Sequence, residues 1–457
     1  MPLTTAQMRA RYPEPMPVLK KLFWAYFLLL IFEGALRKWI LPPLSAPLLL
    51  IRDPIALMII FEAYRENKWP EKWSTVTGIL GVGLIGLCVI QLVAGNNPWF
   101  AGLYGLRSYL LPFPVAFIMG EYLDEEDLRK FGVMTLWILL PMTLLEIAQY
   151  RAGSGSFLNK GAYEGGTQIF YTSEHVRASG TFSFVTGPMS FCPLAAAFIF
   201  YGFVNEKLAP KWLLWTAAFA LLLSVPVIGS RTVVYELAAV VACAGIAALC
   251  GVSQLIQSMK VAVPMLVISF LVSLLPLFSE ASVDLHQRFK QASGSEGSLA
   301  HAVEDRTFGS ILYAIEQTDF TSNPFGNGMG VGAAAITKLT QGEVMFLAGE
   351  GEIGRVFYEL GPFPGLFFML FCFVLVASIA AAAVAKARNH EPLALLLVPL
   401  VFTSLSGVME QPTEQGFMVV AVAFSLAALR GNKTALLPIR SFSPATRMRP
   451  APRRLTS

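Results

Sequence analysis

Apolar runs of about 20 residues recur along almost the whole chain, and short polar segments separate them. A helix of that length crosses the hydrocarbon core of a bilayer. Within lipid, only helices and closed barrels satisfy their backbone polar groups, and the sequence lacks the short alternating segments typical of barrel strands. The pattern therefore predicts an all-α polytopic membrane protein with about twelve transmembrane helices.

The apolar runs also set the expected boundaries. One transmembrane domain spans residues 1–430, with two long loops at about 150–180 and 278–354, the second between helices 9 and 10. The tail, residues 431–457, is rich in Pro, Ser and Arg and is predicted to be a disordered basic segment. The predicted helices lie near residues 17–36, 44–63, 74–95, 99–120, 130–149, 181–204, 211–229, 232–250, 260–279, 355–385, 392–411 and 414–430.

Composition and charge support this class. Charged residues make up 14% of the chain, against about 25% in soluble domains. The positions of Lys and Arg place both termini in the cytoplasm, if the chain lies in a bacterial inner membrane. The five cysteines lie in apolar runs without CxxC or metal-ligand spacing, so we expect them to pack and expect no metal or cofactor. The basic tail alone does not indicate nucleic-acid binding.

Four arginines fall at membrane depth or at its outer edge, where an ionised side chain costs a few kcal/mol and needs a reason. They are Arg107 within the fourth helix, Arg177 and Arg231 at the outer starts of the sixth and eighth, and Arg355 at the start of the tenth. A guanidinium binds phosphate oxygens through two parallel hydrogen bonds, and a helix start adds positive potential. The set predicts a site for an anionic ligand, while snorkelling or internal ion pairing is the structural alternative.

Acidic and glycine-rich positions precede and open the tenth helix. Glu352, Arg355 and Glu359 share one helical face, so that Arg355 is positioned to hold Glu359. Glu352 or Glu350 would then face the loop as a general base, unless it only caps the first helical turn. The glycine-dense stretch Gly326-Asn-Gly328-Met-Gly330-Val-Gly332 lacks the Gly-Lys-Ser/Thr of a phosphate-binding loop and predicts a tight turn with close backbone approach.

Other polar groups have simpler interpretations. Glu33 and Arg37 are spaced i, i+4 and are expected to pair at the end of the first helix. The interruption Arg52-Asp53 in the second helix suggests a buried local pair. His175 and His301 lie in the outer loops, where a solvated side chain is the expectation and participation in a site is the alternative.

Several short motifs occur in an order that resembles a known superfamily. They are Glu33-Gly-Ala-Leu-Arg37-Lys-Trp39, Arg177-Ala-Ser-Gly180-Thr-Phe, Gly229-Ser230-Arg231, Asn323-Pro324-Phe-Gly326-Asn-Gly328-Met-Gly330, and Glu350 through Arg355 to Glu359-Leu-Gly361. In this order, with a long loop between helices, the chain resembles the O-antigen polymerase and O-antigen ligase superfamily. The first motif resembles the exopolysaccharide-polymerase branch.

The resemblance implies a glycosyltransferase C-like helical fold. It also implies a sugar substrate carried on undecaprenyl diphosphate, with transfer at the periplasmic face. Glu350-Gly351 stands where the ligase branch has a His-Asn pair, which favours the polymerase branch. The expected reaction is inverting and metal-independent, with Arg107, Arg177, Arg231 and Arg355 on the donor diphosphate. Membrane lipids are expected neighbours, and a chain-length regulator and a flippase of the same pathway are candidate partners.

Three other functions stay open at this stage. A ligase would transfer the glycan to another acceptor through the same chemistry. A lipid-linked oligosaccharide transporter would have a charged central cavity and inverted repeats, which the sequence does not display. A membrane scaffold would leave the arginines at membrane depth without a purpose.

Overall fold

The computed structural model describes residues 17–95, 97–162, 175–252, 276–295, 324–333, 336, 352–406 and 411–430. Within these ranges the chain is helical, with isolated β-bridges but no strand. Most of the predicted ninth helix, the predicted tail and Glu350 lie outside the described residues, and the side chain of Glu352 does too.

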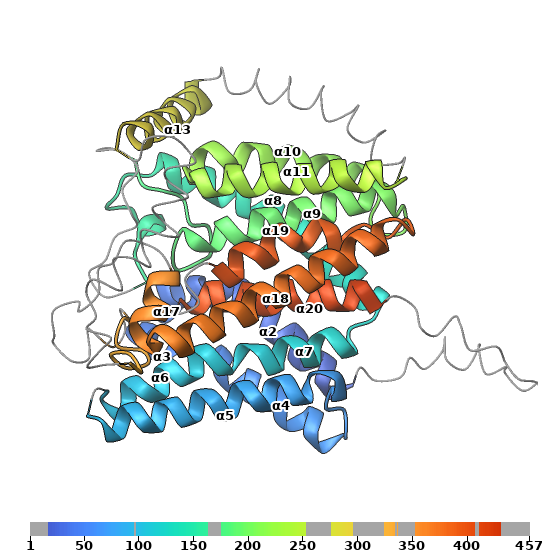
Figure 1. Cartoon of the computed structure of the whole chain (residues 1–457). Coiled ribbons are helices and arrows are strands. Elements are labelled where there is room, and N and C mark those ends of the chain that lie inside the picture. Colours follow the sequence, from blue (N-terminus) through green and yellow to red (C-terminus); the bar gives the residue numbers. More distant parts are fainter. Residues whose placement is uncertain are drawn as a thin grey trace, which may run out of the picture.

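Most helices lie side by side in one bundle with roughly parallel axes (Figure 1). The helices in chain order are α2 (Val18–Ala35), η1 (Leu36–Ile40), η2 (Pro42–Leu44), α3 (Ser45–Leu48), α4 (Arg52–Arg65), α5 (Glu71–Val93), α6 (Trp99–Leu110), α7 (Pro112–Tyr122), α8 (Glu125–Arg151), η3 (Phe157–Asn159), α9 (Thr186–Val204), α10 (Lys211–Ile228), α11 (Arg231–Leu249), α13 (Pro276–Ser295), α17 (Glu352–Leu360), α18 (Pro362–Ala387), α19 (Leu393–Ser406) and α20 (Pro412–Arg430).

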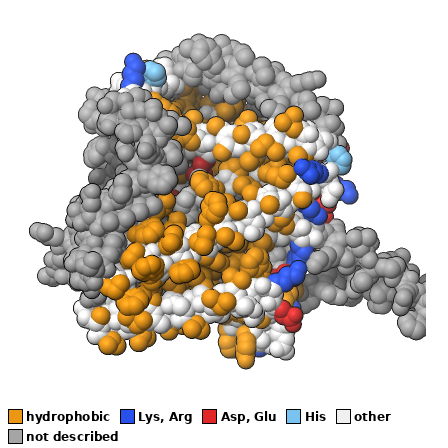
Figure 2. All heavy atoms as spheres, viewed as in Figure 1, with side chains coloured by type: hydrophobic (Ala, Val, Ile, Leu, Met, Phe, Trp, Pro, Cys, Tyr) orange, Lys and Arg blue, Asp and Glu red, His pale blue; other side chains and the backbone are white. Residues whose placement is uncertain are grey.

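The bundle has the properties of a membrane domain. Among the described residues, eight helical segments are long and apolar enough to cross a bilayer. Figure 2 shows hydrophobic side chains over the lateral surface of the helices, whereas charged side chains gather toward the ends. The prediction of an all-α polytopic membrane protein is confirmed, and the total of twelve transmembrane helices stays a prediction.

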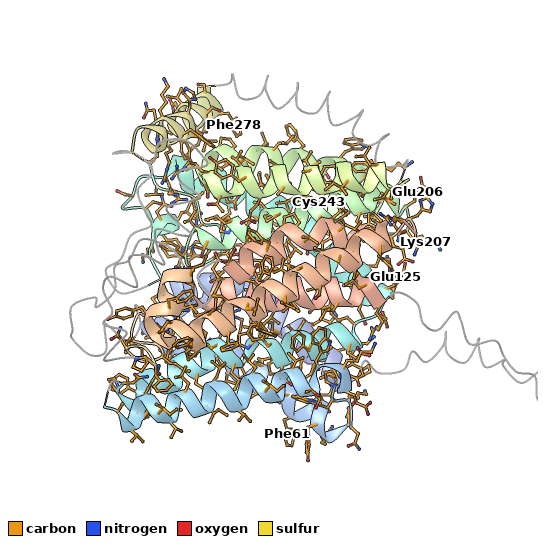
Figure 3. The ribbon with its side chains drawn as sticks, in the orientation of Figure 1. Phe61, Glu125, Glu206, Lys207, Cys243 and Phe278 are labelled. Carbon is orange, nitrogen blue, oxygen red and sulfur yellow. The ribbon has the colours of Figure 1, made fainter. Side chains whose placement is uncertain are left out.

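Both ends of the bundle are defined by contacts. Lys20, near the start of α2, bonds Asp124 at 2.8 Å, and Arg430, at the end of α20, lies 3.9 Å from Glu121. The first and last described helix ends therefore meet the α7–α8 turn at one end, which we call the terminal end. Glu125 and Lys207 lie at this end and Phe278 at the opposite one, which we call the loop end (Figure 3).

Helix α20 lies at the centre of the bundle. An aromatic cluster surrounds it, with Phe424 at 5.2 Å from Phe131 and 6.0 Å from Phe198, and with Phe27 at 5.1 Å from Phe131 between ring centroids. All four rings are fully buried. This apolar core fixes the helices whose polar ends meet at the loop end.

Several predicted helices have different boundaries in the structure, and three of them bear on the site. The predicted fourth helix is interrupted at Leu111, between α6 and α7, since Pro112 cannot donate a backbone hydrogen bond. The predicted tenth is split into α17 and α18 at Gly361, which has a φ of 85°. The predicted sixth begins at Thr186 rather than at residue 181, because Gly180 adopts a φ of 57° and the chain turns before the helix starts.

Candidate functional site

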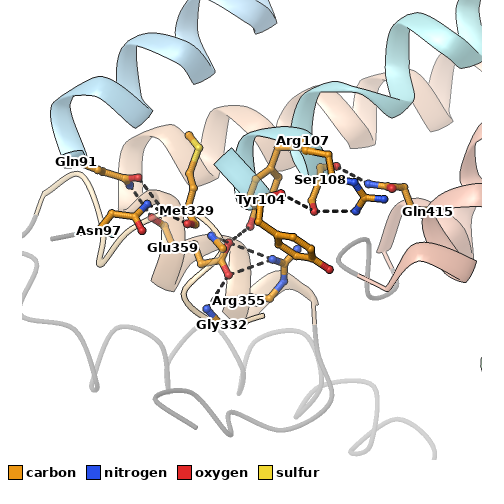
Figure 4. Close-up of polar contacts among 12 residues, drawn as sticks. Gln91, Asn97, Tyr104, Arg107, Ser108, Met329, Gly332, Arg355, Glu359 and Gln415 are labelled. Atoms are coloured by element: carbon orange, nitrogen blue, oxygen red, sulfur yellow. Dashed lines mark hydrogen bonds and ion pairs between the residues drawn. The ribbon is translucent and has the colours of Figure 1, made fainter. Parts of the chain in front are cut away.

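A buried carboxylate organises the glycine-rich loop at the loop end. Glu359, in α17, is 0% exposed and accepts hydrogen bonds from Tyr109 Oη at 2.8 Å, Gly330 N at 2.9 Å and Gly332 N at 3.0 Å. Arg355 completes the shell, with Nη1 at 3.1 and 3.0 Å from the two carboxylate oxygens (Figure 4). The predicted pairing of Arg355 with Glu359 is confirmed.

The loop is also held against α5 and α6. Gln91 donates to the carbonyl groups of Phe325 at 2.7 Å and Glu359 at 2.8 Å, and it accepts from Met329 N at 2.9 Å. Asn97 Nδ2 donates to Met329 O at 2.9 Å. A side chain of α5 and one from the turn before α6 thus satisfy the loop backbone. We call this loop, together with Gln91, Asn97, Tyr109, Arg355 and Glu359, the glycine-loop cluster.

Glycine is required here by backbone conformation and space. Gly326 and Gly328 have φ values of 76° and 117°, which disfavour any other residue. A Cβ atom on Gly105 of α6 would lie 2.5 Å from the backbone N of Gly330. The prediction of a tight turn with close backbone approach is confirmed for this loop.

Arg107 faces a carboxylate from another helix. Its Nε and Nη2 atoms bond the two oxygens of Asp53 at 2.6 and 2.8 Å. Arg52 instead bonds Glu33 at 3.2 Å and donates to the carbonyl of Pro412. The expected local pair Arg52-Asp53 is therefore wrong, because neighbouring residues on a helix point in different directions.

The end of the first helix meets the segment that precedes α9. Arg37 bonds Glu33 at 3.2 Å, as predicted, and its Nη1 also donates to Ser183 Oγ at 2.9 Å. Lys38 is 1% exposed, and its Nζ donates to Ser179 Oγ at 3.1 Å and to Gly180 O at 2.7 Å. Two motifs that are far apart in the sequence are thus joined by hydrogen bonds.

A third element fixes the same segment from α8. Gln149 Oε1 accepts from Ser179 N at 3.1 Å and from Gly180 N at 2.8 Å, while its Nε2 donates to Gly180 O at 3.1 Å. Thr181 Oγ1 donates to Ile31 O at 2.6 Å. The backbone from residue 179 to 181 is therefore held between α2 and α8.

Arg177 lies just before residues 179–181, in a segment with extended backbone. Val176 and Ala178 are 0% exposed, whereas His175 and Arg177 are partly exposed, which is the alternation of an extended chain. The prediction that Arg177 lies at a helix start is wrong, because α9 begins only at Thr186.

Arg231 lies close to this segment in the fold. It is the first residue of α11, as predicted, and it is partly buried. Ala178 N donates to Val227 O at 3.3 Å, which places the segment of Arg177 beside the turn that leads into α11. Arg177 and Arg231 therefore come from adjacent backbone segments at the loop end.

His175 belongs to a polar triad with two other elements. Its Nδ1 lies 3.2 Å from Asp284 Oδ2 of α13, and Tyr150 Oη of α8 donates to the same oxygen at 2.7 Å. The rings of Tyr150 and His175 stack at 4.3 Å with an interplanar angle of 18°. The expectation of a solvated loop histidine is wrong for His175.

Helix α13 carries Asp284 into this position. Its residues Phe278 and Ala281 are buried against Tyr150 and Val227 in one apolar cluster. The segment was predicted to begin a long loop, but it is helical through Ser295 and packs on α10 and α11. We call His175, Arg177, Arg231, Tyr150 and Asp284 the outer arginine patch.

Sequence reasoning missed two buried acids beneath the patch. Glu146 of α8 and Glu236 of α11 are 1% and 5% exposed, and one carboxylate oxygen of each has no hydrogen-bond partner among the described residues. Both interrupt apolar runs, so the depth criterion applied to the arginines would also have found them.

Most of the predicted site residues that the structure describes fall into two groups at the loop end, whereas Arg107 pairs with Asp53 outside both groups. Arg355, Glu359, Gly326 and Gly328 lie in the glycine-loop cluster, and Arg177 and Arg231 lie in the outer arginine patch. Among the described residues, no three His, Cys, Asp or Glu side chains are grouped as metal ligands. No family model, curated protein or solved structure matches this chain.

Proposed function

We propose that this protein is a bacterial polysaccharide polymerase that joins repeat units carried on undecaprenyl diphosphate. The observation that supports this most is the convergence of distant polar motifs at one end of an apolar bundle. The Glu33–Trp39 motif clamps the segment of Arg177, and that segment lies beside Arg231. A lipid-linked diphosphate would present its charge at this depth, where the helices end.

The contacts divide the four predicted arginines by role. Arg107 and Arg355 already face the carboxylates of Asp53 and Glu359, so their positive charge is largely compensated. In this proposal Arg107 and Arg355 stabilise the structure of the loop end. Contact with the donor diphosphate is assigned to Arg177 and Arg231, because their backbone segments lie side by side at the loop end.

The reaction is a direct displacement at the anomeric carbon. The acceptor hydroxyl oxygen forms the new glycosidic bond while the bond from the anomeric carbon to the diphosphate oxygen breaks. The leaving diphosphate takes the electron pair, and guanidinium groups that are already in place stabilise its growing charge. Displacement from the opposite face inverts the anomeric centre, and diphosphate is a good enough leaving group to require no metal.

The reaction also needs a base for the acceptor hydroxyl. Glu350 and Glu352 are the candidates from the sequence, because Glu350 precedes and Glu352 begins the helix that carries Arg355 and Glu359. In this proposal the loop end faces the periplasm, both termini are cytoplasmic, and the predicted ninth helix completes twelve spans in the inner membrane.

The first test is polymer synthesis by the purified protein. Polyprenyl-diphosphate-linked repeat units are incubated with it without nucleotide or added metal, and a ladder of longer glycans is the expected product. Sugar transferred instead to lipid A core or to protein would indicate a ligase. No transfer to any acceptor would favour the transporter or the scaffold.

The second test concerns the arginines. Arg177→Ala and Arg231→Ala should each lower the turnover number by about 10²–10³-fold, since each removes a charge-stabilising donor. Arg151→Ala is the matched control, because Arg151 is exposed at the loop end of α8 and should tolerate the change. Full activity in both variants would overturn the arginine assignment.

A further inference from the structure

The triad of the outer arginine patch joins three distant parts of the chain. His175 comes from the segment before α9, Tyr150 from the last turn of α8, and Asp284 from the middle of α13. One oxygen, Asp284 Oδ2, receives both Tyr150 Oη at 2.7 Å and His175 Nδ1 at 3.2 Å. The ring of Tyr150 covers one face of the imidazole at 4.3 Å. The orientation of the imidazole is therefore set by a hydrogen bond and a stacked ring.

This arrangement selects a tautomer. A neutral imidazole that donates from Nδ1 to a carboxylate has its basic lone pair on Nε2. When Nε2 accepts a proton, Nδ1–H continues to donate to the carboxylate, so the hydrogen bond to Asp284 is kept. The His175 side chain is 23% exposed and that of Asp284 13%, so the pair is largely shielded from solvent but not sealed. Such a pair is suited to take a proton from a hydroxyl group.

The position of the His175–Asp284 pair relative to Arg177 suggests which group the imidazole would contact. His175 and Arg177 occupy alternate positions of one extended segment, and the residues between and after them, Val176 and Ala178, are 0% exposed. Side chains at alternate positions of an extended chain point to the same side. A diphosphate at Arg177 would thus place the sugar that it carries near the imidazole.

We propose that His175, oriented by Asp284, is the general base for the acceptor sugar in this reaction, an assignment that rests on the proposed polymerase function. Nε2 removes the proton of the acceptor hydroxyl as its oxygen bonds to the anomeric carbon. The bond to the diphosphate breaks, and the polyprenyl diphosphate leaves with the electron pair. The imidazolium then releases its proton to water. Asp284 and Tyr150 are positioning residues in this step.

A purely structural role for the triad is the rival explanation, since Asp284 also ties α13 to α8. The variant His175→Asn separates the two, because the Asn amide is able to donate to Asp284 but has no basic nitrogen. The base assignment predicts a loss of about 10²–10⁴-fold in turnover number for His175→Asn. The Michaelis constant for the lipid-linked donor should change by less than about threefold, since the arginines are intact.

Chemical rescue distinguishes a base from a purely structural residue, because added imidazole replaces a missing base but does not repair a structural defect. Imidazole added to His175→Ala should restore part of the polymerisation rate in a concentration-dependent way, and it should not accelerate the wild-type protein. Asp284→Asn should lower the turnover number by a smaller factor, and imidazole should not restore it. His286→Ala is the matched control, because His286 is an exposed histidine on the same helix, α13.

The outcomes distinguish this inference from the proposed function. A ladder from the wild-type protein, together with full activity in His175→Asn, would overturn the base assignment and leave the polymerase standing, with Glu350 or Glu352 as the base. Absence of rescue in a folded His175→Ala protein that has lost activity would also count against it. Absence of a wild-type ladder would refute the polymerase itself. Loss in His175→Asn, with rescue of His175→Ala, is the result expected.

Discussion

The substitution Glu359→Gln tests whether one carboxylate holds the glycine-rich loop in place. Glu359 is 0% exposed and receives hydrogen bonds from one phenol, two backbone amides and Arg355, at 2.8–3.1 Å. Glutamine has almost the same shape, but it removes the negative charge and turns an NH₂ group toward these donors. Arg355, which is 5% exposed, then loses its carboxylate partner Glu359. Removing one partner of a buried ion pair costs about 3–5 kcal/mol, and we expect a loss of this size in the free energy of unfolding.

Denaturant titration in mixed micelles measures that loss. Cys88, Cys192 and Cys372 are buried free cysteines, so a thiol-reactive dye reports unfolding. Glu126→Gln is the matched control, because Glu126 also pairs with an arginine on its own helix, Arg129, at 2.7 Å, but with side chains that are 53% and 39% exposed. An exposed pair contributes about 1 kcal/mol or less, so the control should unfold close to the wild-type protein.

A second variant identifies the buried charge as the cause. The double variant Glu359→Gln/Arg355→Met removes both members of this buried ion pair, so it should be less destabilised than the sum of the two single variants. The expected interaction energy is about 1–3 kcal/mol. Strict additivity, or a single Glu359→Gln variant as stable as the control, would refute the reasoning that this ion pair anchors the loop.

Three further predictions concern packing and hydrogen bonds at the loop end. Gly105→Ala should lower the free energy of unfolding by about 1–3 kcal/mol, because its Cβ atom would lie 2.5 Å from the backbone of the glycine-rich loop. In Gly83→Ala the new Cβ atom meets nothing within 4 Å, so this variant should raise the free energy of unfolding by about 0.5–1 kcal/mol. Denaturant titrations of both variants test this contrast. Asp53→Asn and Arg107→Gln should each lower the free energy of unfolding by about 2–3 kcal/mol, because each breaks the same ion pair. The two variants should make equal amounts of polymer per folded protein. A lower turnover number in Arg107→Gln alone would instead indicate that Arg107 contacts the ligand. Lys38→Met removes two hydrogen bonds to the segment before α9, and each lost bond contributes about 1 kcal/mol to holding that segment in place. Polymer ladders should therefore show at least about a tenfold fall in turnover number for variant protein that still inserts in the membrane.

The helices were largely predictable, because an apolar run of sufficient length has few other structures available in a bilayer. Their ends were less so where a distant contact decides them. The start of α9 moves to Thr186 because residues 181–183 pack against Gly34 of α2 and Gly180 adopts a left-handed conformation. Nothing within the apolar run of α9 itself carries that information.

Ion pairs were likewise predictable only where spacing along one helix determines them. Glu33 with Arg37, and Arg355 with Glu359, were predicted because i, i+4 spacing on a helix brings side chains together whatever the rest of the fold does. Asp53 with Arg107 and His175 with Asp284 are separated by 54 and 109 positions. Their pairing depends on how helices pack, which a single sequence does not reveal.

The proposed polymerase and the alternative transporter predict different positions for polar groups along the helices. A transporter is expected to hold its substrate near the midplane of the membrane, at breaks in its helices. Among the described residues, the glycine-loop cluster and the outer arginine patch lie at the loop end instead, with Arg231 at the start of α11 and Gln91 within the last turn of α5. Compensated arginines, such as Arg355, shape this end, while Arg177 and Arg231 are partly exposed beside the histidine pair. Charge near the helix ends fits a ligand with an anionic head and a lipid tail, because the head stays near the interface while the tail remains in the bilayer. A polyprenyl diphosphate sugar has this form, so the positions of these two clusters are consistent with the proposed transfer at the membrane surface.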